Sequence, residues 1–331
     1  MRHIRATVAF GGLTPFVALA WAADTSTQDT GALRRLQYTH RSSHEAIAWQ
    51  KHVRSELLTL LRLDDLIRRK IPFDRKVLST ADKGAYAQEE LEINSTTTRR
   101  IKVVLTVPKG KSAPYPAVVC IHGHGGSRFA VHDASSVYKG FAVALAAGAV
   151  TVATDVGQHE VYEKAQGRTL MGERLWDVMR CVDYVASMPE VDRSKIGCAG
   201  LSLGGEMAMW LGAMDERISA TVSSGFLTLM DQMEKNHCLC WKFPGLRERV
   251  DYPDIYALIA PRALQCQNGL KEGPKDFYVP LARRAMEQVR AIYADLGRPE
   301  NAELDVHEGG HEIDLPGLLS FFRKHLGVAC P

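Results

Sequence analysis

Short apolar runs alternate with segments of helical periodicity along most of the chain after residue 88. Most of these runs show no polar alternation, and several end at glycine or proline, which is typical of strands buried on both faces of a parallel sheet. The strand-like runs cover residues 89–94, 101–107, 115–123, 150–157, 194–200, 218–225, 262–269 and 302–310. This order predicts an α/β fold, with a mostly parallel central sheet and helices on both of its faces.

The segments between these runs place apolar residues at helical spacing. Within residues 172–189, for example, Leu175, Val178 and Val182 fall on one face of a helix. Other such segments cover residues 140–149, 204–215, 281–297 and 315–327. Helices in these places supply the crossover connections that parallel strands require.

A further amphipathic helix is predicted at residues 44–63, ahead of the alternating region. Trp49, Val53 and Leu57 lie on one of its faces. We expect this helix to pack across the main domain as a structural cover. Together with a polar leader typical of a flexible segment, it forms a predicted N-terminal extension over residues 23–84. The predicted catalytic domain then covers residues 85–331.

One segment interrupts the alternation. Residues 225–260 lie between two strand-like runs and are too long for a single crossover helix. An insertion of this length in a compact domain is usually a lid or a binding segment. Trp241, Phe243 and Tyr252 are candidates to line a pocket there, although each is equally suited to the core.

The first 22 residues have the three-part layout of a secretory signal peptide. A basic start, "MRHIR", precedes an uncharged apolar run, and Ala20 and Ala22 supply small residues for cleavage. Gly11 and Pro15 interrupt the run, which makes a membrane-spanning helix less favoured. The sequence therefore predicts an exported protein, secreted or periplasmic, with no membrane association after signal removal. An uncleaved N-terminal anchor is the alternative.

Composition narrows the choice of partners. The chain has 331 residues, of which 46% are hydrophobic and 24% are charged, and its formal net charge is +3. These values are ordinary for a globular domain, and Lys and Arg do not gather into one basic stretch. We therefore expect no nucleic-acid partner. No feature of the chain indicates an oligomeric state.

The seven cysteines do not predict a metal site. Cys120, Cys198 and Cys266 lie in apolar runs, where cysteine usually acts as a small hydrophobic residue. The cysteines of "CLC", residues 238–240, are too closely spaced for an ordinary zinc pair. An odd number leaves at least one thiol unpaired within a monomer, and the disulfide pairing stays open.

Ser202 is the candidate nucleophile. It stands in G-L-S-L-G, residues 200–204, between a strand-like run and a helical segment. A nucleophile elbow needs this strand-turn-helix context, and side chains two residues either side of the serine would collide. Gly200 and Gly204 remove that collision. The amide dipoles at the start of the helix also favour developing negative charge.

The candidate general base follows the last strand-like run. His311 lies on a glycine loop after Gly310, from which it can reach a serine at the carboxyl edge of the sheet. His307 stands nearer the end of the strand and is expected to be structural. His311 is therefore the predicted partner of Ser202.

The carboxylate that orients the histidine should lie between the serine and the histidine, after the preceding strand. Glu272 is close to the end of the run at 262–269, and Asp276 follows in the same loop. Either carboxylate can hold the imidazole tautomer. Glu272 is favoured, Asp276 is the alternative acid, and Asp231 after the earlier strand is a more remote candidate.

An oxyanion hole requires two backbone N–H groups. Leu203, which follows the nucleophile, supplies one, and the glycine-rich loop "CIHGHGGS" supplies the other, with His124 as the candidate donor. His122 and His124 also have a spacing possible for metal ligands. Because no third ligand stands near them in the sequence, no metal and no cofactor is predicted.

Other polar residues follow the run at 150–157. Asp155, Gln158, His159 and Glu160 either contact substrate or close a loop. Arg174 and Asp177 lie on a predicted helix, where structural ion pairs are expected.

The order Ser202, carboxylate, His311, with "HGHGG" upstream, resembles the α/β-hydrolase superfamily over roughly residues 85–328. "VDRSKIGCAGLSLGGEMA", "ALIAPRAL" and "HEGGHE" are similar to exported bacterial members of the acetyl xylan esterase-like and dienelactone hydrolase-like branch. Relatives commonly show N-G-x-x-D at the acid loop, whereas Glu272 stands at that place here, so the identity of the acid stays open.

The resemblance implies an exported serine hydrolase that cleaves carboxylic esters through an acyl-enzyme, with carbohydrate acetyl esters as possible substrates. A dienelactone hydrolase would normally carry cysteine at the position of Ser202. A serine peptidase or amidase of the same superfamily, and a non-catalytic binding protein on the same fold, are the alternatives.

Overall fold

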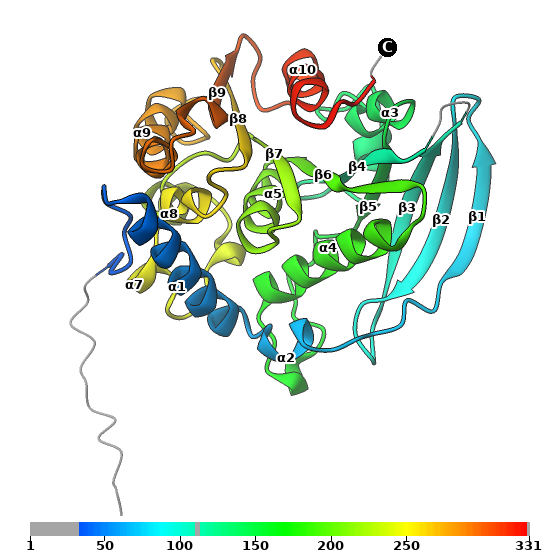
Figure 1. Ribbon diagram of the computed structural model, residues 1–331, viewed down its shortest axis with the longest axis horizontal. Helices are drawn as coiled ribbons and strands as arrows, with labels where there is room; N and C mark the ends of the chain where they lie inside the picture. Colours follow the sequence, from blue (N-terminus) through cyan, green and yellow to red (C-terminus); the bar gives the residue numbers. More distant parts are fainter. Residues whose placement is uncertain (1–32, 110–112, 330–331) are drawn as a thin grey trace, which may run out of the picture. The chain divides into compact units, whose positions relative to one another are not determined.

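A nine-stranded sheet runs through the described residues, 33–109 and 113–329, of the computed structural model (Figure 1). The predicted signal peptide, residues 1–22, and the first residues of the predicted leader lie outside this part. The strand order is β1-β2-β3-β5-β4-β6-β7-β8-β9. The strands are β1 (Lys76–Asp82), β2 (Tyr86–Asn94), β3 (Arg100–Pro108), β4 (Tyr115–Ile121), β5 (Val150–Thr154), β6 (Val191–Leu201), β7 (Ile218–Ser224), β8 (Ala263–Gly269) and β9 (Ala302–His307).

The sheet is parallel from β5 to β9 and antiparallel at its N-terminal edge. Strands β4, β6, β7, β8 and β9 pair in parallel, as does β5 with β4, whereas β1, β2, β3 and β5 pair antiparallel. Every residue of β4, β5 and β8 is buried, as is the second half of β6, from Ile196 to Leu201. The predicted mostly parallel α/β fold is confirmed.

Strand β1 was not predicted from the sequence. All seven of its residues are exposed, so it has no buried face and no apolar pattern. Backbone pairing with β2 holds it in the sheet. The sheet therefore begins at Lys76, ahead of the predicted domain start at residue 85.

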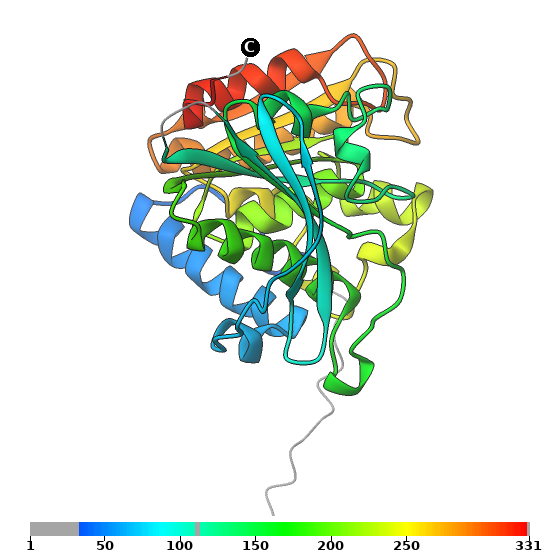
Figure 2. The same cartoon turned by 90° about the vertical axis from the view of Figure 1, so that its right-hand side faces the viewer.

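Helices cover both faces of the sheet, as Figures 1 and 2 show. They are α1 (Ser43–Leu61), α2 (Asp64–Ile67), α3 (Phe141–Ala146), α4 (Leu170–Ser187), α5 (Leu203–Met214), α6 (Met230–Asn236), α7 (Leu246–Arg249), α8 (Tyr252–Ala257), α9 (Val279–Asp295) and α10 (Leu315–Leu326). Single-turn 3₁₀ helices are η1 (Ala130–His132), η2 (Lys164–Gln166), η3 (Leu239–Trp241) and η4 (Pro299–Asn301). Helices α3 and α10 build one apolar cluster, and α1, α4, α5, α8 and α9 build the larger one.

Helix α1 covers the larger cluster, as the sequence predicts. Ser42 and Glu45 form a capping box at its start, which satisfies backbone N–H groups that have no partner inside the helix. Trp49, Val53 and Leu57 are buried. The helix belongs to the same folded unit as the sheet. No helix among the described residues is long and apolar enough to span a bilayer.

The insertion at residues 225–260 folds into α6, η3, α7 and α8. Tyr252 and Phe243 pack in the core, Tyr252 against Phe226 and Phe243 against Trp210. Trp241 is buried as well and lines a cavity beside Ser202. Of the three aromatic candidates, Trp241 lines the cavity beside Ser202, and Phe243 also borders a separate pocket next to α7.

Candidate active site

Ser202 occupies a strained turn between β6 and α5. Its φ of 63° and ψ of −124° lie in a region that non-glycine residues rarely adopt. Its N–H donates to the Ser224 carbonyl at 2.9 Å, which fixes the turn against the end of β7. A Cβ at Gly200 would lie 2.3 Å from the Gly204 carbonyl oxygen, and one at Gly204 would lie 2.2 Å from that of Ile121. Both glycines are therefore required by close backbone approach, the geometry of a nucleophile elbow.

The loop after β4 lies directly beside this turn. A Cβ at Gly123 would be 3.1 Å from the Cβ of Ser202. The N–H of Gly123 donates to the Tyr138 hydroxyl oxygen at 2.6 Å, so this amide is already engaged. Leu203 is the first residue of α5, and its amide has no carbonyl acceptor inside the helix. The structure thus places the two predicted oxyanion donors, His124 and Leu203, on segments that meet at Ser202.

His122 braces the same loop from behind. The ring is fully buried; Nδ1 lies 2.8 Å from the Gly123 carbonyl oxygen, and Nε2 accepts the Val156 N–H at 3.0 Å. Burial lowers the pKa of His122, which keeps the ring neutral. Both ring nitrogens are therefore used in positioning the loop.

His311 and Glu272 form a hydrogen-bonded pair. His311 Nδ1 lies 3.0 Å from Glu272 Oε2, and the Glu272 side chain is only 3% exposed. The same carboxylate accepts the Phe277 N–H at 3.2 Å, and the Phe277 ring stacks on the imidazole. Glu272 thus engages Nδ1 of His311, so Nε2 is the ring nitrogen left to act as a base.

The other predicted candidates lie elsewhere. Asp276 is exposed; Gln232 donates to its backbone carbonyl. Asp231 is exposed and paired with Arg247. His307 Nδ1 accepts the Gly309 N–H at 3.2 Å, which agrees with the structural role expected for it. Only Glu272 among the carboxylate candidates contacts His311 in the structure.

Gly225 provides the seat for His311. Its φ is +56°, and a Cβ there would lie 2.8 Å from Cε1 of the imidazole. Because Gly225 follows Ser224, whose carbonyl accepts the Ser202 N–H, this contact places His311 beside the elbow.

We predict that Gly225→Ala lowers kcat about 100-fold. The added methyl group would lie 2.8 Å from Cε1 of His311, so the imidazole must move away from its position beside Ser202. Steady-state kinetics on an activated acetyl ester measure the effect. Gly297→Ala is the matched control, since Gly297 has a φ of +69° and open space around its Cβ position. Equal losses in the two variants would attribute the effect to backbone strain and contradict the prediction.

A small enclosed cavity of about 60 Å³ adjoins Ser202. Its walls come from α5, from the residues after β7 and from the insertion, with Leu203, Phe226, Met233 and Trp241 contributing apolar surface. Such a space fits a short acyl group.

Glu206 also lines this cavity, and the sequence analysis did not single it out. Its side chain is buried on α5, and burial raises its pKa to about 8, with partial compensation from the Arg174 guanidinium. A carboxyl group neutral at pH 7 can donate a hydrogen bond to a substrate oxygen. The available signal was that Glu206 is the single charged residue in α5.

We predict that Glu206→Gln stabilises the protein increasingly as pH rises from 5 to 8. In this window the unfolded wild-type chain releases the Glu206 proton and the folded chain retains it, so wild-type stability falls with pH. The difference between variant and wild type should reach a few kcal/mol at pH 8. Urea unfolding at pH 5, 6, 7 and 8 measures it, with the exposed Glu287→Gln as control. A difference that does not change with pH would refute the raised pKa.

The ion pairs expected on α4 are only half correct. Asp177 is buried and accepts from Arg99 at 2.7 Å, as an ion pair. Arg174 forms no ion pair among the described residues. Its guanidinium is fully buried and donates to the Gln158 carbonyl and to Cys240 Sγ. The helical spacing could not show that Arg174 points into the insertion rather than along the helix.

The residues after β5 have divided roles. Asp155 pairs with Arg128 at 2.7 Å and closes the loop, and the exposed Glu160 lies 3.9 Å from Lys164. Gln158 lines a larger polar groove of about 1030 Å³, which runs past the loop containing Gly125. His159 instead lies beside His124, with ring centroids 5.2 Å apart.

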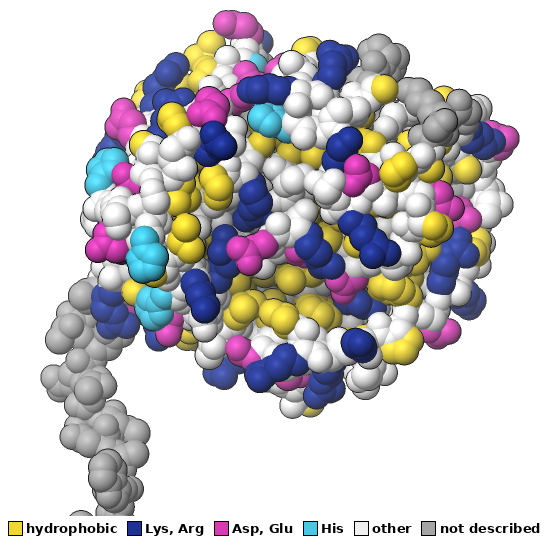
Figure 3. Space-filling model, viewed as in Figure 1, with side chains coloured by type: hydrophobic (Ala, Val, Ile, Leu, Met, Phe, Trp, Pro, Cys, Tyr) yellow, Lys and Arg dark blue, Asp and Glu magenta, His cyan; other side chains and the backbone are white. Residues whose placement is uncertain are grey.

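Surface charge shows no single-sign patch on the face seen in Figure 3. Basic and acidic side chains are interspersed among the described residues there.

The sequence of this chain is similar to those of known esterases and hydrolases. The family model described as "Glucuronyl esterase, fungi" matches residues 92–226. The Bacillus subtilis protein YtaP, which carries a hydrolase description, is 24% identical over 232 residues, or 63% of this chain and 77% of that protein. A 4-O-methyl-glucuronoyl methylesterase of Hypocrea jecorina is 28% identical over 143 residues, which are 42% of this chain and only 29% of that protein.

Solved structures show the same architecture. A Bacteroides fragilis protein described as an acetyl xylan esterase superposes with a TM-score of 0.73 at 17% identity, covering 89% of this chain and 92% of that one. A glucuronoyl esterase from Solibacter usitatus superposes with a TM-score of 0.64 at 16% identity, covering 86% and 97%. The predicted resemblance to α/β-hydrolase esterases and the predicted fold are confirmed, and the predicted class, a carboxylic ester hydrolase, is supported.

Proposed function

We propose that this α/β-hydrolase-fold carboxylic ester hydrolase is a serine esterase that removes short acyl groups, acetate above all, from carbohydrate. The observation that carries the proposal is the small cavity beside Ser202, combined with the pairing of His311 and Glu272 at 3.0 Å. Export of the chain is part of the proposal and follows from the signal-like first 22 residues.

The proposed reaction uses Ser202 as the nucleophile. His311 takes the serine proton as the hydroxyl attacks the ester carbonyl, and Glu272 stabilises the resulting imidazolium. The N–H groups of Leu203 and His124 bind the tetrahedral oxyanion. The alcohol leaves with the proton from His311, and a water activated by the same histidine hydrolyses the acyl-enzyme.

The shape of the cavity selects the acyl side of the ester. An acetyl group fits a space of about 60 Å³, whereas a six-membered sugar ring does not. The alcohol side then lies outside this cavity. The larger polar groove includes Gly125, which follows His124 of the cavity wall, and its hydrogen-bonding side chains, such as Gln158 and Tyr162, suit a carbohydrate. The substrate class is thus an acetylated saccharide.

A uronate ester is the second candidate, because the matching family model describes glucuronyl esterases. In that reaction the sugar is the acyl group and the alcohol is the small partner. The insertion would have to move away from Ser202 to admit the ring, since Met233 and Trp241 close the cavity.

The test is an ester panel with the purified full chain. We expect hydrolysis of p-nitrophenyl acetate and of acetylated xylo-oligosaccharides, with a rate at least about tenfold lower for the butyrate ester. Methyl and benzyl glucuronates and peptide anilides should be poor substrates. Preference for a glucuronate ester would establish the second candidate. No hydrolysis of any ester, together with no labelling by a fluorophosphonate, would overturn the proposal.

A further inference from the structure

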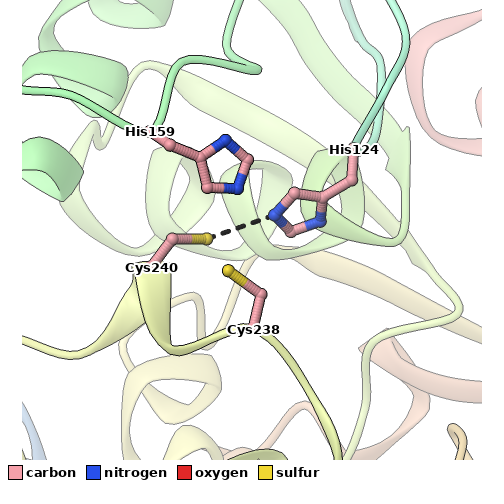
Figure 4. Close-up of side chains that lie close together, drawn as sticks. All are labelled: His124, His159, Cys238 and Cys240. Atoms are coloured by element: carbon pink, nitrogen blue, oxygen red, sulfur yellow. Dashed lines mark hydrogen bonds between the residues drawn. The ribbon is translucent and has the colours of Figure 1, made fainter.

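Four side chains with metal-binding atoms lie together: His124, His159, Cys238 and Cys240 (Figure 4). Three of them, His124, Cys238 and Cys240, also line the cavity beside Ser202. Each offers one ring nitrogen or one thiol sulfur, and these atoms all lie within 4.8 Å of one another. His124 Nε2 is 3.1 Å from Cys240 Sγ. The close-up shows the four side chains pointing toward a common centre.

These residues come from three segments that are far apart in the sequence. His124 follows β4, His159 follows β5, and the two cysteines belong to the insertion, around the start of η3. Along the chain, no third ligand stands near the histidine pair, and "CLC" is too closely spaced for an ordinary zinc pair. In the folded chain the two cysteines lie beside His124. The second histidine of the cluster is His159 and not His122, whose ring nitrogens are both engaged.

We propose that His124, His159, Cys238 and Cys240 form a tetrahedral site for a divalent cation of intermediate softness, zinc above all. Two imidazoles and two thiolates are a donor set that Zn²⁺ binds in proteins. Zinc bonds of about 2.1 Å to nitrogen and about 2.3 Å to sulfur place ligand atoms about 3.3–3.8 Å apart. Rotation of exposed side chains closes the longest separation of 4.8 Å.

The surrounding charge supports bound thiolates. Arg174 is fully buried, and its guanidinium donates to Cys240 Sγ at 3.4 Å. A buried cation needs an anionic or strongly polar partner, and a metal-bound thiolate supplies one. Donation to a ligand sulfur from outside the coordination sphere is also how proteins orient and stabilise metal ligands.

The position of the site gives it a structural consequence. A bound ion would join the insertion to the loop of His124 and to the loop after β5; the first two of these segments line the cavity beside Ser202. The walls of the cavity would then be fixed by coordination bonds rather than by side-chain packing alone. The proposed metal site does not rest on the proposed function. Metal content and cobalt spectroscopy test it without any measurement of ester hydrolysis.

Metal content and spectroscopy test the site on the full chain, produced without a histidine tag and kept in reductant. After incubation with ZnCl₂ and desalting, we expect about one zinc per chain by mass spectrometry of metals. With Co²⁺ instead, we expect a thiolate-to-cobalt charge-transfer band in the near ultraviolet and d–d bands typical of a tetrahedral ion. These two measurements require no variant, so they do not depend on the folding of a mutant.

Variants then assign the ligands. Cys238→Ser/Cys240→Ser should abolish zinc retention and the charge-transfer band, and His159→Ala should weaken zinc binding in a competition with a chromophoric chelator. His44→Ala, at an exposed histidine far along the chain, is the control and should leave both readouts unchanged. Absence of the band in wild type, its persistence in the double variant, or a stable Cys238–Cys240 disulfide in the metal-free chain as isolated would overturn the proposal.

Discussion

Ser202→Ala is expected to lower kcat/KM for p-nitrophenyl acetate by about 10⁴-fold or more. Alanine removes the attacking oxygen, and the oxyanion donors and the binding surface then account for the residual rate. Serine and alanine both carry a Cβ, so the strain of a φ of 63° at this position is similar in the two chains. Stability should therefore change by less than about 1 kcal/mol.

Initial rates, fluorophosphonate labelling and thermal unfolding of the purified variant measure these effects together. Ser194→Ala, at an exposed serine in β6, is the control and should retain wild-type activity and labelling. Labelling of the Ser202→Ala chain at wild-type level would show that another residue is the nucleophile. A loss of activity accompanied by unfolding would assign Ser202 to the fold instead.

Glu272→Gln is expected to lower kcat about 10³- to 10⁴-fold, with little change in KM. The neutral amide no longer stabilises the imidazolium of His311, and its NH₂ group can force the wrong tautomer. The side-chain oxygen of glutamine can still accept the Phe277 N–H, so the loop should keep its shape. Steady-state kinetics and the pH dependence of kcat/KM measure the loss.

Asp276→Asn is the matched control for this variant, because it makes the same charge change in the same loop. The Asp276 side chain is exposed and does not contact His311, so we expect activity within about threefold of wild type. If Asp276→Asn lost activity and Glu272→Gln kept it, the assignment of the acid would be reversed. Comparable large losses in both would indicate that the loop, rather than one carboxylate, supports the histidine.

The sequence by itself determined the mostly parallel part of the sheet and the place of the candidate nucleophile. Buried parallel strands must be apolar along their length, and the helices that connect them must carry an apolar face, so both leave periodic patterns. The glycines around Ser202 are dictated by backbone contacts within the turn and with β4, which recur wherever such an elbow forms. The strand and helix patterns depend on how many faces an element buries, and the glycines depend on the geometry of one turn. Both can therefore be recognised in the sequence.

Strand β1 shows where this reasoning stops. It is held by backbone hydrogen bonds to β2 and buries no side chain, so its residues carry no apolar signal. Arg174 shows the same limit on a helix. Its neighbours at helical spacing suggested an ion pair, and only the packed insertion reveals that it faces Cys240.

The tertiary structure alone decided which carboxylate meets His311 and which residues gather around the cavity. Glu272 and Asp276 follow the same strand. The loop turns the Glu272 carboxylate inward, where it accepts the Phe277 N–H and lies 3.0 Å from His311 Nδ1, and leaves the Asp276 carboxylate in solvent. His124, His159 and the two cysteines converge because three loops end at one edge of the sheet. Such contacts join residues far apart in the sequence, so they cannot be predicted from spacing along the chain.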